Sequence, residues 1–291
     1  MRKLISRLSL LVAALPLVIV APVSAGANDF FTDFDSQPEN LYFVNFESGV
    51  ATPGLACGVD ACASFENDGE RSYMRVSVNP STTPGDYVNT DITQLDLGQN
   101  TTNKGSYTAT YGHPVILEAR IKWSENYDLL GLSNKAEGTS GIVLWNPALD
   151  GPYGYPTGEY DHIGFVWASK DVMAGLITGF TGTTIVNQLP LGVARPLFPV
   201  NINDWMDVKM VWSENILGIQ TVTYYVNNKL LGIHVLPVKL KGLALEIWND
   251  NGEPTLCLEG LGSGGLPLCE ENPSPAESQS FYIDYVKIIQ P

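Results

Sequence analysis

Two carboxylates stand two residues apart in the stretch GEYDHIGF, residues 158–165, and no further acid follows within it. They are Glu159 and Asp161. Residues i and i+2 of a β-strand point to the same face of a sheet, so this spacing predicts that both side chains reach one surface. Such a pair can cleave a glycosidic bond, bind a sugar, hold a metal ion or merely face water. The stretch is the first candidate site.

A second group of acids lies in LALEIWND, residues 243–250. Strict alternation places Glu246, Trp248 and Asp250 on one face of this predicted strand. A face made of two acids and a tryptophan is not a core face, so it is either open to solvent or part of a binding groove. Tryptophan supplies a large apolar ring, and ligand sites combine such rings with a few polar groups. We predict a groove here, with Asn249 beside it at the strand end.

Further aromatic residues close neighbouring predicted strands. Trp145 stands next to last in GIVLWN, Trp167 ends HIGFVW, and the loop before the second strand contains Tyr155. For the two tryptophans the sequence leaves two interpretations open, a sugar platform or a place in the core. The predicted carbohydrate-binding set is Trp145, Tyr155, Glu159, Asp161, Trp167, Trp248, Asn249 and Asp250.

The elements that must position these residues are strands. After the first 25 residues helical periodicity is almost absent, and short runs rich in β-branched and aromatic residues alternate with turn signals. Asn227-Asn228 has the composition of a tight hairpin turn. Trp123 and Trp212 lie on the apolar side of alternating strands and are predicted core residues. The pattern predicts an all-β fold, a two-sheet antiparallel β-sandwich or jelly roll, forming one domain over residues 41–291.

Two segments flank or interrupt this domain. Residues 26–40 are polar and irregular, and we predict a loose leader there. Residues 251–280 are rich in Gly, Pro, Ser and Glu and are predicted to form a long excursion between the last two strands.

The N-terminal 25 residues have the anatomy of a secretory signal peptide. A basic start is followed by an apolar run and by the small-residue sequence Val23-Ser24-Ala25. The alternative is a membrane anchor that is retained, although Pro16 and Pro22 favour cleavage. We expect a secreted or cell-surface protein that does not insert into the membrane after cleavage.

The charge of the chain limits its partners. The formal net charge is −15, and removal of residues 1–25 takes away three basic residues and no acid. An acidic surface repels phosphate backbones and so disfavours nucleic acid. It suits neutral sugars or calcium, and we expect a polysaccharide or glycan as the partner.

The four cysteines fall into two close pairs. Cys57 and Cys62 bracket CGVDAC, and Cys257 and Cys269 bracket a longer loop. An oxidising compartment favours two local disulfides, chosen by proximity among three connectivities. A zinc site is the rival, but no histidine lies nearby and the spacings do not suit zinc.

The order of the strand phrases FVNFESG, VILEARIKW, GIVLWN, GEYDHIGFVW, DWMDVKMVWS, YYVNNKLLG and FYIDYVKI resembles the concanavalin A-like lectin/glucanase superfamily. Within it, the order is most similar to the jelly rolls of glycoside hydrolase family 16 and to laminin-G-like and carbohydrate-binding modules. The resemblance covers roughly residues 41–291. It implies two curved antiparallel sheets with a concave face that binds or cleaves polysaccharide.

The resemblance also implies where catalysis should lie. In the family 16 enzymes one strand carries Glu-x-Asp-x-x-Glu, or a version one residue shorter, as nucleophile, tuning acid and acid/base. In this chain the first two fall on Glu159 and Asp161, but the third falls on Gly164, or on Ile163 in the shorter form. Neither can donate a proton, and general acid catalysis contributes about 10²–10⁴-fold. We therefore expect that retaining hydrolysis is absent, unless another strand supplies the acid, with Glu246 and Asp250 as candidates.

Related jelly rolls often hold a structural calcium between their first and last strands. The resemblance places such an ion at Glu47 and Asp284, with Asp68 and Gly69 supplying further oxygens, because calcium takes six to eight oxygen ligands.

Three functions remain open from the sequence. The first is a secreted, non-catalytic carbohydrate-binding jelly roll. The second is a glycoside hydrolase or polysaccharide lyase with a non-standard acid/base, and the third is a structural or adhesive cell-surface protein.

Overall fold

The computed structural model describes residues 29–38, 40–45, 50–53, 57–58, 60–81, 88–94, 106–133, 135–146, 161–170, 177–186, 189–256, 268–271, 273, 275 and 277–291. These residues form strands, turns and connecting segments and no helix, so among them there is none that could cross a membrane. Within this part of the chain the fold is all-β, as predicted.

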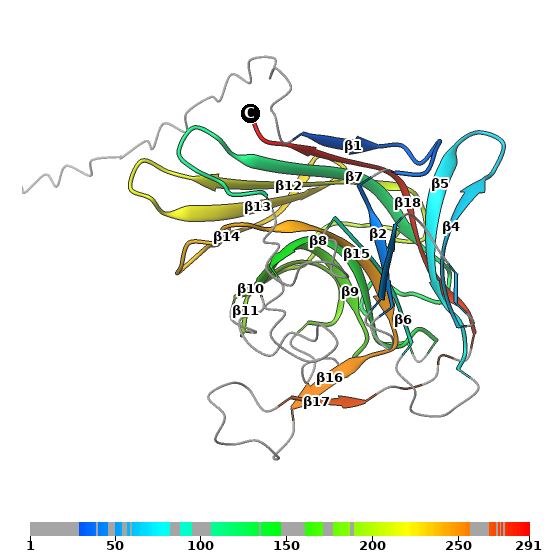
Figure 1. The fold of residues 1–291 in the computed structure, drawn as a ribbon. Helices are drawn as coiled ribbons and strands as arrows, with labels where there is room; N and C mark the ends of the chain where they lie inside the picture. Colours follow the sequence, from blue (N-terminus) through cyan, green and yellow to red (C-terminus); the bar gives the residue numbers. More distant parts are fainter. Residues whose placement is uncertain are drawn as a thin grey trace, which may run out of the picture.

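Two antiparallel sheets of eight strands each pack against one another (Figure 1). The first, here called the back sheet, has the order β14-β13-β12-β7-β18-β5-β4, and β1 pairs with β18 beside this path. Its strands are β1 Phe30–Thr32, β4 Ala61–Asn67, β5 Ser72–Val78, β7 Val115–Trp123, β12 Met206–Glu214, β13 Gln220–Val226, β14 Lys229–Val235 and β18 Gln279–Ile289.

The second sheet, here called the arched sheet, has the order β11-β10-β9-β8-β15-β6-β2-β3. Figure 1 shows that its strands bend into an arch that opens away from the back sheet, and we call the face inside the arch the concave face. Its strands are β2 Tyr42–Asn45, β3 Val50–Pro53, β6 Asn89–Thr93, β8 Thr139–Asn146, β9 Asp161–Ala168, β10 Gly179–Val186, β11 Leu189–Ala194 and β15 Ala244–Asp250.

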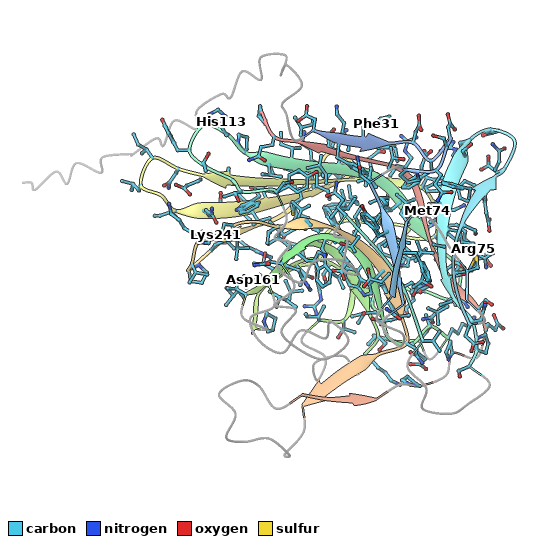
Figure 2. The ribbon with its side chains drawn as sticks, viewed as in Figure 1. Phe31, Met74, Arg75, His113, Asp161 and Lys241 are labelled. Carbon is cyan, nitrogen blue, oxygen red and sulfur yellow. A yellow bond between two sulfur atoms is a disulfide. The ribbon has the colours of Figure 1, made fainter. Side chains whose placement is uncertain are left out.

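The core lies between the two sheets. Along β7, β12 and β13 every second residue is buried, because one face of the back sheet packs on the interior and the other meets solvent. Figure 2 labels two neighbours on β5 of the same sheet, of which Met74 is fully buried and Arg75 is half-exposed. Trp123 and Trp212 are buried in this core, which confirms the prediction for both.

The interior tryptophan Trp123 joins both sheets. Its ring stacks on Phe281 of the back sheet with centroids 4.7 Å apart and lies 5.4 Å from Phe180 of the arched sheet. Its indole Nε1 donates a hydrogen bond to Ser140 Oγ of β8 at 2.6 Å. Large aromatic rings of this kind bury about 150–250 Å² each and contribute strongly to a sandwich core.

The structure corrects the prediction for residues 26–40. Phe30–Thr32 form β1, which pairs with β18 opposite Val286–Ile288, and Phe34 is buried in the core. The polar residues around this short strand hid it in the sequence. The jelly-roll domain therefore begins before residue 41.

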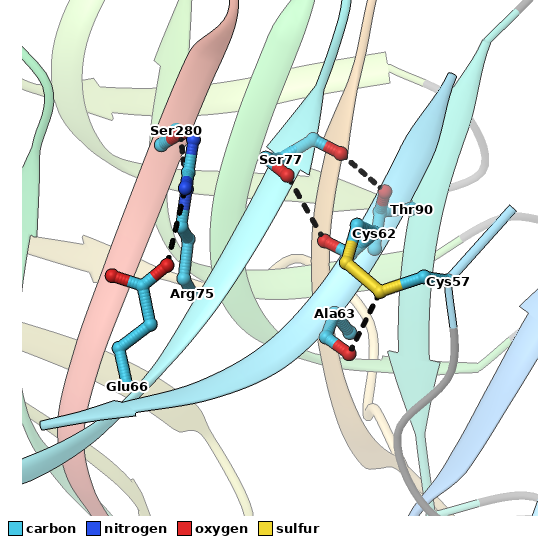
Figure 3. The surroundings of a disulfide bond; sticks show 8 residues. All are labelled: Cys57, Cys62, Ala63, Glu66, Arg75, Ser77, Thr90 and Ser280. Carbon is cyan, nitrogen blue, oxygen red and sulfur yellow. Dashed lines mark hydrogen bonds and ion pairs between the residues drawn. A yellow bond between two sulfur atoms is a disulfide. The ribbon is translucent and has the colours of Figure 1, made fainter. Parts of the chain in front are cut away.

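Local predictions of turns and disulfides can be checked at two places. Asn227 and Asn228 have φ values of 48° and 62° and join β13 to β14, which confirms the hairpin. Cys57 and Cys62 form a disulfide, and Ser77 Oγ donates to the carbonyl of Cys62 (Figure 3). Thr90 Oγ1 donates to the carbonyl of Ser77 and so links β6 of the arched sheet to β5 of the back sheet.

The predicted excursion over residues 251–280 contains a two-stranded sheet of β16 Glu253–Leu256 and β17 Leu268–Glu271. The predicted second disulfide involves Cys257, which lies outside the described residues.

Candidate functional site

The concave face has its own cluster of apolar side chains, separate from the main core. It contains Val143 and Trp145 of β8, Val166 and Ala168 of β9, and Ala244 and Trp248 of β15. The strands of the arch are therefore buried on both faces, unlike those of the back sheet.

Strand β15 places its residues as the sequence predicts. Ala244, Glu246 and Trp248 point to the concave face, whereas Leu245 and Ile247 point to the core. Asn249 follows the core side, because it is fully buried and hydrogen-bonds across to the back sheet. Its Nδ2 donates to the carbonyls of Val76 and Gln279. The structure thus corrects the prediction that Asn249 meets a sugar: this side chain ties the two sheets together.

Trp248 lies across the neighbouring strand β8. A Cβ atom on Gly141 would lie 2.9 Å from Trp248 Cη2, so only glycine leaves room for the indole there. The indole Nε1 donates to Thr139 Oγ1 at 2.8 Å, and Thr139 Oγ1 donates in turn to Asp250 Oδ1 at 2.9 Å. The ring orientation is therefore fixed by a glycine beneath it and by a hydrogen bond at its edge.

Trp145 extends in the opposite direction, over the small side chain of Ala244. Its Nε1 donates to Thr93 Oγ1 of β6 at 3.3 Å. Trp145 and Trp248 consequently flank Glu246, which lies between Ala244 and Trp248 on β15.

The most unusual feature of the concave face is a buried carboxyl pair. Asp91 of β6 and Glu246 of β15 are 3% and 5% exposed, and they lie close enough for each to change the pKa of the other. Burial raises the pKa of Asp91 to about 8, with the charge of Asp250 acting in the same direction and the hydrogen bond from Glu246 acting against it. Burial and the neighbouring Asp91 raise the pKa of Glu246 well above its usual range. Both shifts favour the protonated, uncharged form of the carboxyl, because burial disfavours its charged form.

Each carboxyl of this pair also has an oxygen without a partner. Asp91 Oδ1 and Glu246 Oε2 are buried and make no hydrogen bond within the described part of the chain. Buried polar atoms in folded proteins almost always have a partner, so each exception requires an explanation such as a water molecule or a ligand.

Sequence reasoning missed Asp91. It stands in NTDIT, a short polar strand that alternation alone would divide into Asn89, Asp91 and Thr93 on one side and Thr90 and Ile92 on the other. That alternation could have indicated that Asp91 faces the same side as Thr93. The signal is weak, however, because the strand is only five residues long and contains a single apolar residue.

Strand β9 turns the opposite way from the prediction. Its residues Ile163, Phe165 and Trp167 face the core, and Val166 and Ala168 face the arch. By the same alternation Asp161, labelled in Figure 2, belongs to the core-facing set at the start of the strand. His162 lies on the concave face, with its ring 6.3 Å from that of Trp248. Burial lowers the pKa of His162 to about 3, so it is neutral there.

The prediction that Trp167 faces a sugar is corrected for the same reason. It is fully buried between the sheets, its Nε1 donates to the carbonyl of Asp128, and its ring meets Tyr127 edge-on at 4.5 Å. It is a core residue, which was the other interpretation left open by the sequence.

The structure gives a physical reason for Gly164. A Cβ atom at this position would collide with the backbone of Ile142 and Val143 on the neighbouring strand β8. The arch thus leaves no space for a side chain where the resemblance places the acid/base.

The remaining predicted site residues either lie away from the concave face or are not among the residues that the structure describes. Glu159, Tyr155 and Glu47 lie outside the described residues. Asp284 of the predicted calcium set is paired with Arg71 and Arg120 at 3.4 and 3.7 Å.

Asp68 and Gly69, also of the calcium set, stand in the turn between β4 and β5. Asp68 Oδ1 accepts the backbone N–H groups of Glu70 and Arg71 there. No three metal-binding side chains gather among the described residues, and an Asp284 carboxylate neutralised by two guanidinium groups does not suit calcium. Because Glu47 is not described, the calcium site stays a prediction.

Comparison with known proteins bears on the fold. The sequence matches no family model and no curated protein. Among solved structures, a β-1,3-1,4-glucanase (lichenase) derived from a mouse hindgut metagenome is similar with a TM-score of 0.50 and 12% identity, over 90% of this chain and 99% of that one.

A κ-carrageenase from Pseudoalteromonas carrageenovora, solved with an oligotetrasaccharide of κ-carrageenan, is similar with a TM-score of 0.50 and 10% identity, over 96% of this chain and 100% of that one. At these identities the likeness concerns the fold alone. The chain has the jelly-roll fold of the concanavalin A-like lectins and glucanases, as the resemblance in its sequence predicts.

Proposed function

We propose that this protein is exported and binds polysaccharide on the concave face of its arched sheet, without cleaving it. The observation that carries the proposal is the pair of buried carboxyl oxygens, Asp91 Oδ1 and Glu246 Oε2, that lack a partner among the described residues, on the face that also carries Trp145 and Trp248. Sugars present both the C–H faces that stack on aromatic rings and the hydroxyl donors that such oxygens require.

The charge of the concave sheet supports an uncharged ligand. None of its eight strands contains a lysine or arginine, whereas Asp91, Glu246 and Asp250 are acids on its concave side. A sulfated or uronate chain would meet these acids without a compensating cation on the strands.

The absence of cleavage is supported by Gly164, which has no room for an acid where a retaining glycosidase of this fold needs its second carboxyl group. Export is supported by the N-terminal sequence of residues 1–25 and by the Cys57–Cys62 disulfide, which suits an oxidising compartment.

Retention of the protein on insoluble polysaccharides tests the proposal. The panel should contain neutral glucans, mannans and galactans beside carrageenan and alginate. We expect retention on at least one neutral polymer and much weaker retention of the Trp248→Ala variant. Retention of wild type on none of them, or unchanged retention of the variant, would refute it.

A glycosidase or lyase with a non-standard acid is the second candidate function. It is favoured by one observation: burial and the neighbouring Asp91 raise the pKa of Glu246 well above its usual range, which is the direction of shift that a general acid requires. Release of reducing ends, or of unsaturated products absorbing in the ultraviolet, from any polymer that the protein binds would establish this function, and we expect neither.

A further inference from the structure

We propose that a groove at one end of the arched sheet binds an amphiphile with a single acyl chain and an anionic head group, such as a long-chain fatty acid. The groove has a volume of about 500 Å³. It lies where the connection between β7 and β8 meets the adjoining ends of β9, β10 and β11. Pockets of this size that are mostly apolar, with a few polar groups, are typical sites for small ligands.

The apolar part of the groove is partly open to water. Leu130 and Leu132 of the β7–β8 connection are 58% and 61% exposed, and Leu197, which follows β11, is 97% exposed. Phe180 of β10 is buried and forms a deeper part of the lining. Covering exposed apolar surface is favourable in proportion to the area removed from water, so an apolar chain laid along these side chains would be stabilised.

The connection that carries two of these leucines is held in shape by Asp128. One oxygen of this carboxylate accepts the backbone N–H groups of Leu130 and Leu132 at 2.9 and 3.2 Å. The other oxygen accepts the N–H of Ser133 at 2.8 Å. The leucines are therefore exposed because the backbone fixes them there, so the groove exists before a ligand binds.

The same connection lies directly on the start of β10. Phe180 donates its backbone N–H to the carbonyl of Leu129 at 3.0 Å. Gly131 and Gly179 have φ values of 65° and 71°, and a Cβ atom on either would collide with backbone atoms across this contact. Only glycine allows so close an approach, and it closes the floor of the groove.

The charge of the lining selects the head group. The chain has 31 acidic and 16 basic residues, yet the ionisable side chains that line the groove are both basic, Lys170 and Arg195. Lys170 follows β9 and Arg195 follows β11, and these strands are the two neighbours of β10 in the sheet. An apolar floor with a basic residue on either side of β10 matches an acyl chain that ends in a carboxylate and opposes a cationic amphiphile.

A discrete ligand fits these observations better than a lipid bilayer. The leucines line a cavity, and the formal net charge of −15 disfavours approach to an anionic membrane surface.

Calorimetric titration with sodium dodecanoate, below the concentration at which it forms micelles, tests the inference. We expect one molecule to bind per chain. Decanoate, which is two methylene groups shorter, should bind about threefold or more weakly. Dodecyltrimethylammonium has the same chain and the opposite charge, and it should bind about tenfold or more weakly than dodecanoate.

Matched variants locate the site. Leu130→Ser and Leu197→Ser should each weaken dodecanoate binding about fivefold or more, and both should stay folded because the replaced side chains are exposed. Leu217→Ser is the control, since Leu217 is 79% exposed between β12 and β13 and does not line the groove. The double variant Lys170→Gln, Arg195→Gln should remove the preference for dodecanoate over dodecyltrimethylammonium.

The contrary results are distinct. Equal affinity of wild type for the two amphiphiles would overturn the assignment of the head group. An equal loss in Leu217→Ser would mean general adsorption and overturn the groove. Binding to lipid vesicles but not to monomeric dodecanoate would assign these leucines to a bilayer surface. Trp248→Ala should bind dodecanoate as wild type does, so this inference and the proposed polysaccharide site can fail separately.

Discussion

The two sheets of this sandwich differ in how they use their outer faces. In the back sheet, β7 and β13 alternate strictly between buried and half-exposed residues. In the arched sheet, β10 is buried along its whole length and β9 along all but its first residue. Antiparallel sheets commonly have one solvated face, so the arched sheet is the exception.

The two sheets also differ in charge. The strands of the back sheet carry basic residues, namely Arg75, Arg120, Lys122, Lys209, Lys229 and Lys287. The strands of the arched sheet carry none, and the acids Asp91 and Glu246 are buried on its concave face. A cation on the back sheet finds water or a surface acid, whereas each polar group inside the arch must find a partner. The comparison indicates that the back sheet supports the fold and that the arched sheet carries the specific chemistry.

The largest effect on stability should come from a substitution at Gly164 in the arched sheet. Gly164→Ala introduces a Cβ against the backbone of β8, and we expect a loss of about 3 kcal/mol in the free energy of unfolding. Urea unfolding measures it. Gly58→Ala is the control, because its Cβ would make an ordinary contact at 3.6 Å with the carbonyl oxygen of Ala61. Equal stability of the two variants would show that the arch is not constrained at Gly164.

The second largest effect on stability should come from a substitution of Asn249, whose side chain links the two sheets. Asn249→Ala leaves the carbonyls of Val76 and Gln279 and the hydroxyl of Tyr127 without their partner, so we expect a loss of about 2–3 kcal/mol. Asn126→Ala removes a single exposed hydrogen bond to Ser278 and should cost less than about 1 kcal/mol. Thermal unfolding compares them. A variant of Asn249 that is stable but loses polysaccharide binding would restore the original prediction of a sugar ligand.

The carboxyl pair should make stability depend on pH. A carboxyl whose pKa is raised by folding binds its proton more tightly in the folded chain, so its contribution is present at low pH and is lost as pH rises through the folded pKa, about 8 for Asp91. His162 acts in the opposite direction, because it is already neutral in the folded chain while the unfolded chain still loses part of its proton above pH 6.5, but over this range it adds less than about 0.5 kcal/mol. We expect wild type to lose about 2 kcal/mol between pH 6.5 and pH 8 for each proton held.

Urea unfolding at several pH values measures this loss. The double variant Asp91→Asn, Glu246→Gln should remove most of the slope, because neither amide titrates. An unchanged slope would mean that other groups cause it.

The smallest effect should come from the back sheet. Lys209 and Glu118 form a cross-strand ion pair of 2.8 Å, with side chains 40% and 29% exposed. Exposed pairs contribute about 0–1 kcal/mol, so Lys209→Gln should change stability by less than about 1 kcal/mol, and less still in high salt. Thermal unfolding at two salt concentrations checks it. An effect as large as that of Asn249→Ala would remove the distinction between the two sheets.

The same comparison explains what the sequence could predict. Strands such as VILEARIKW alternate because one face meets water, and they identified the core face around Trp123 and Trp212 correctly. Strand β9 is apolar on both faces, so its sequence gave no means of deciding whether Asp161 or His162 faces the arch. The prediction for Asn249 was wrong because its polar side chain makes hydrogen bonds across the sandwich rather than facing a ligand. Asp91 was not predicted because its neighbour Glu246 is distant in the sequence. Long-range pairing of this kind leaves no local pattern.

One matched pair of variants tests the central claim, that ligand binds to the arched sheet. Trp248→Ala and Trp205→Ala make the same change on opposite sheets, since Trp205 packs against Tyr73 and Lys122 on the back sheet. The measurement is calorimetric titration of each folded variant with the polysaccharide that wild type binds. We predict at least a tenfold loss of affinity for Trp248→Ala and wild-type affinity for Trp205→Ala. The reverse result would place the binding site on the back sheet and contradict the account.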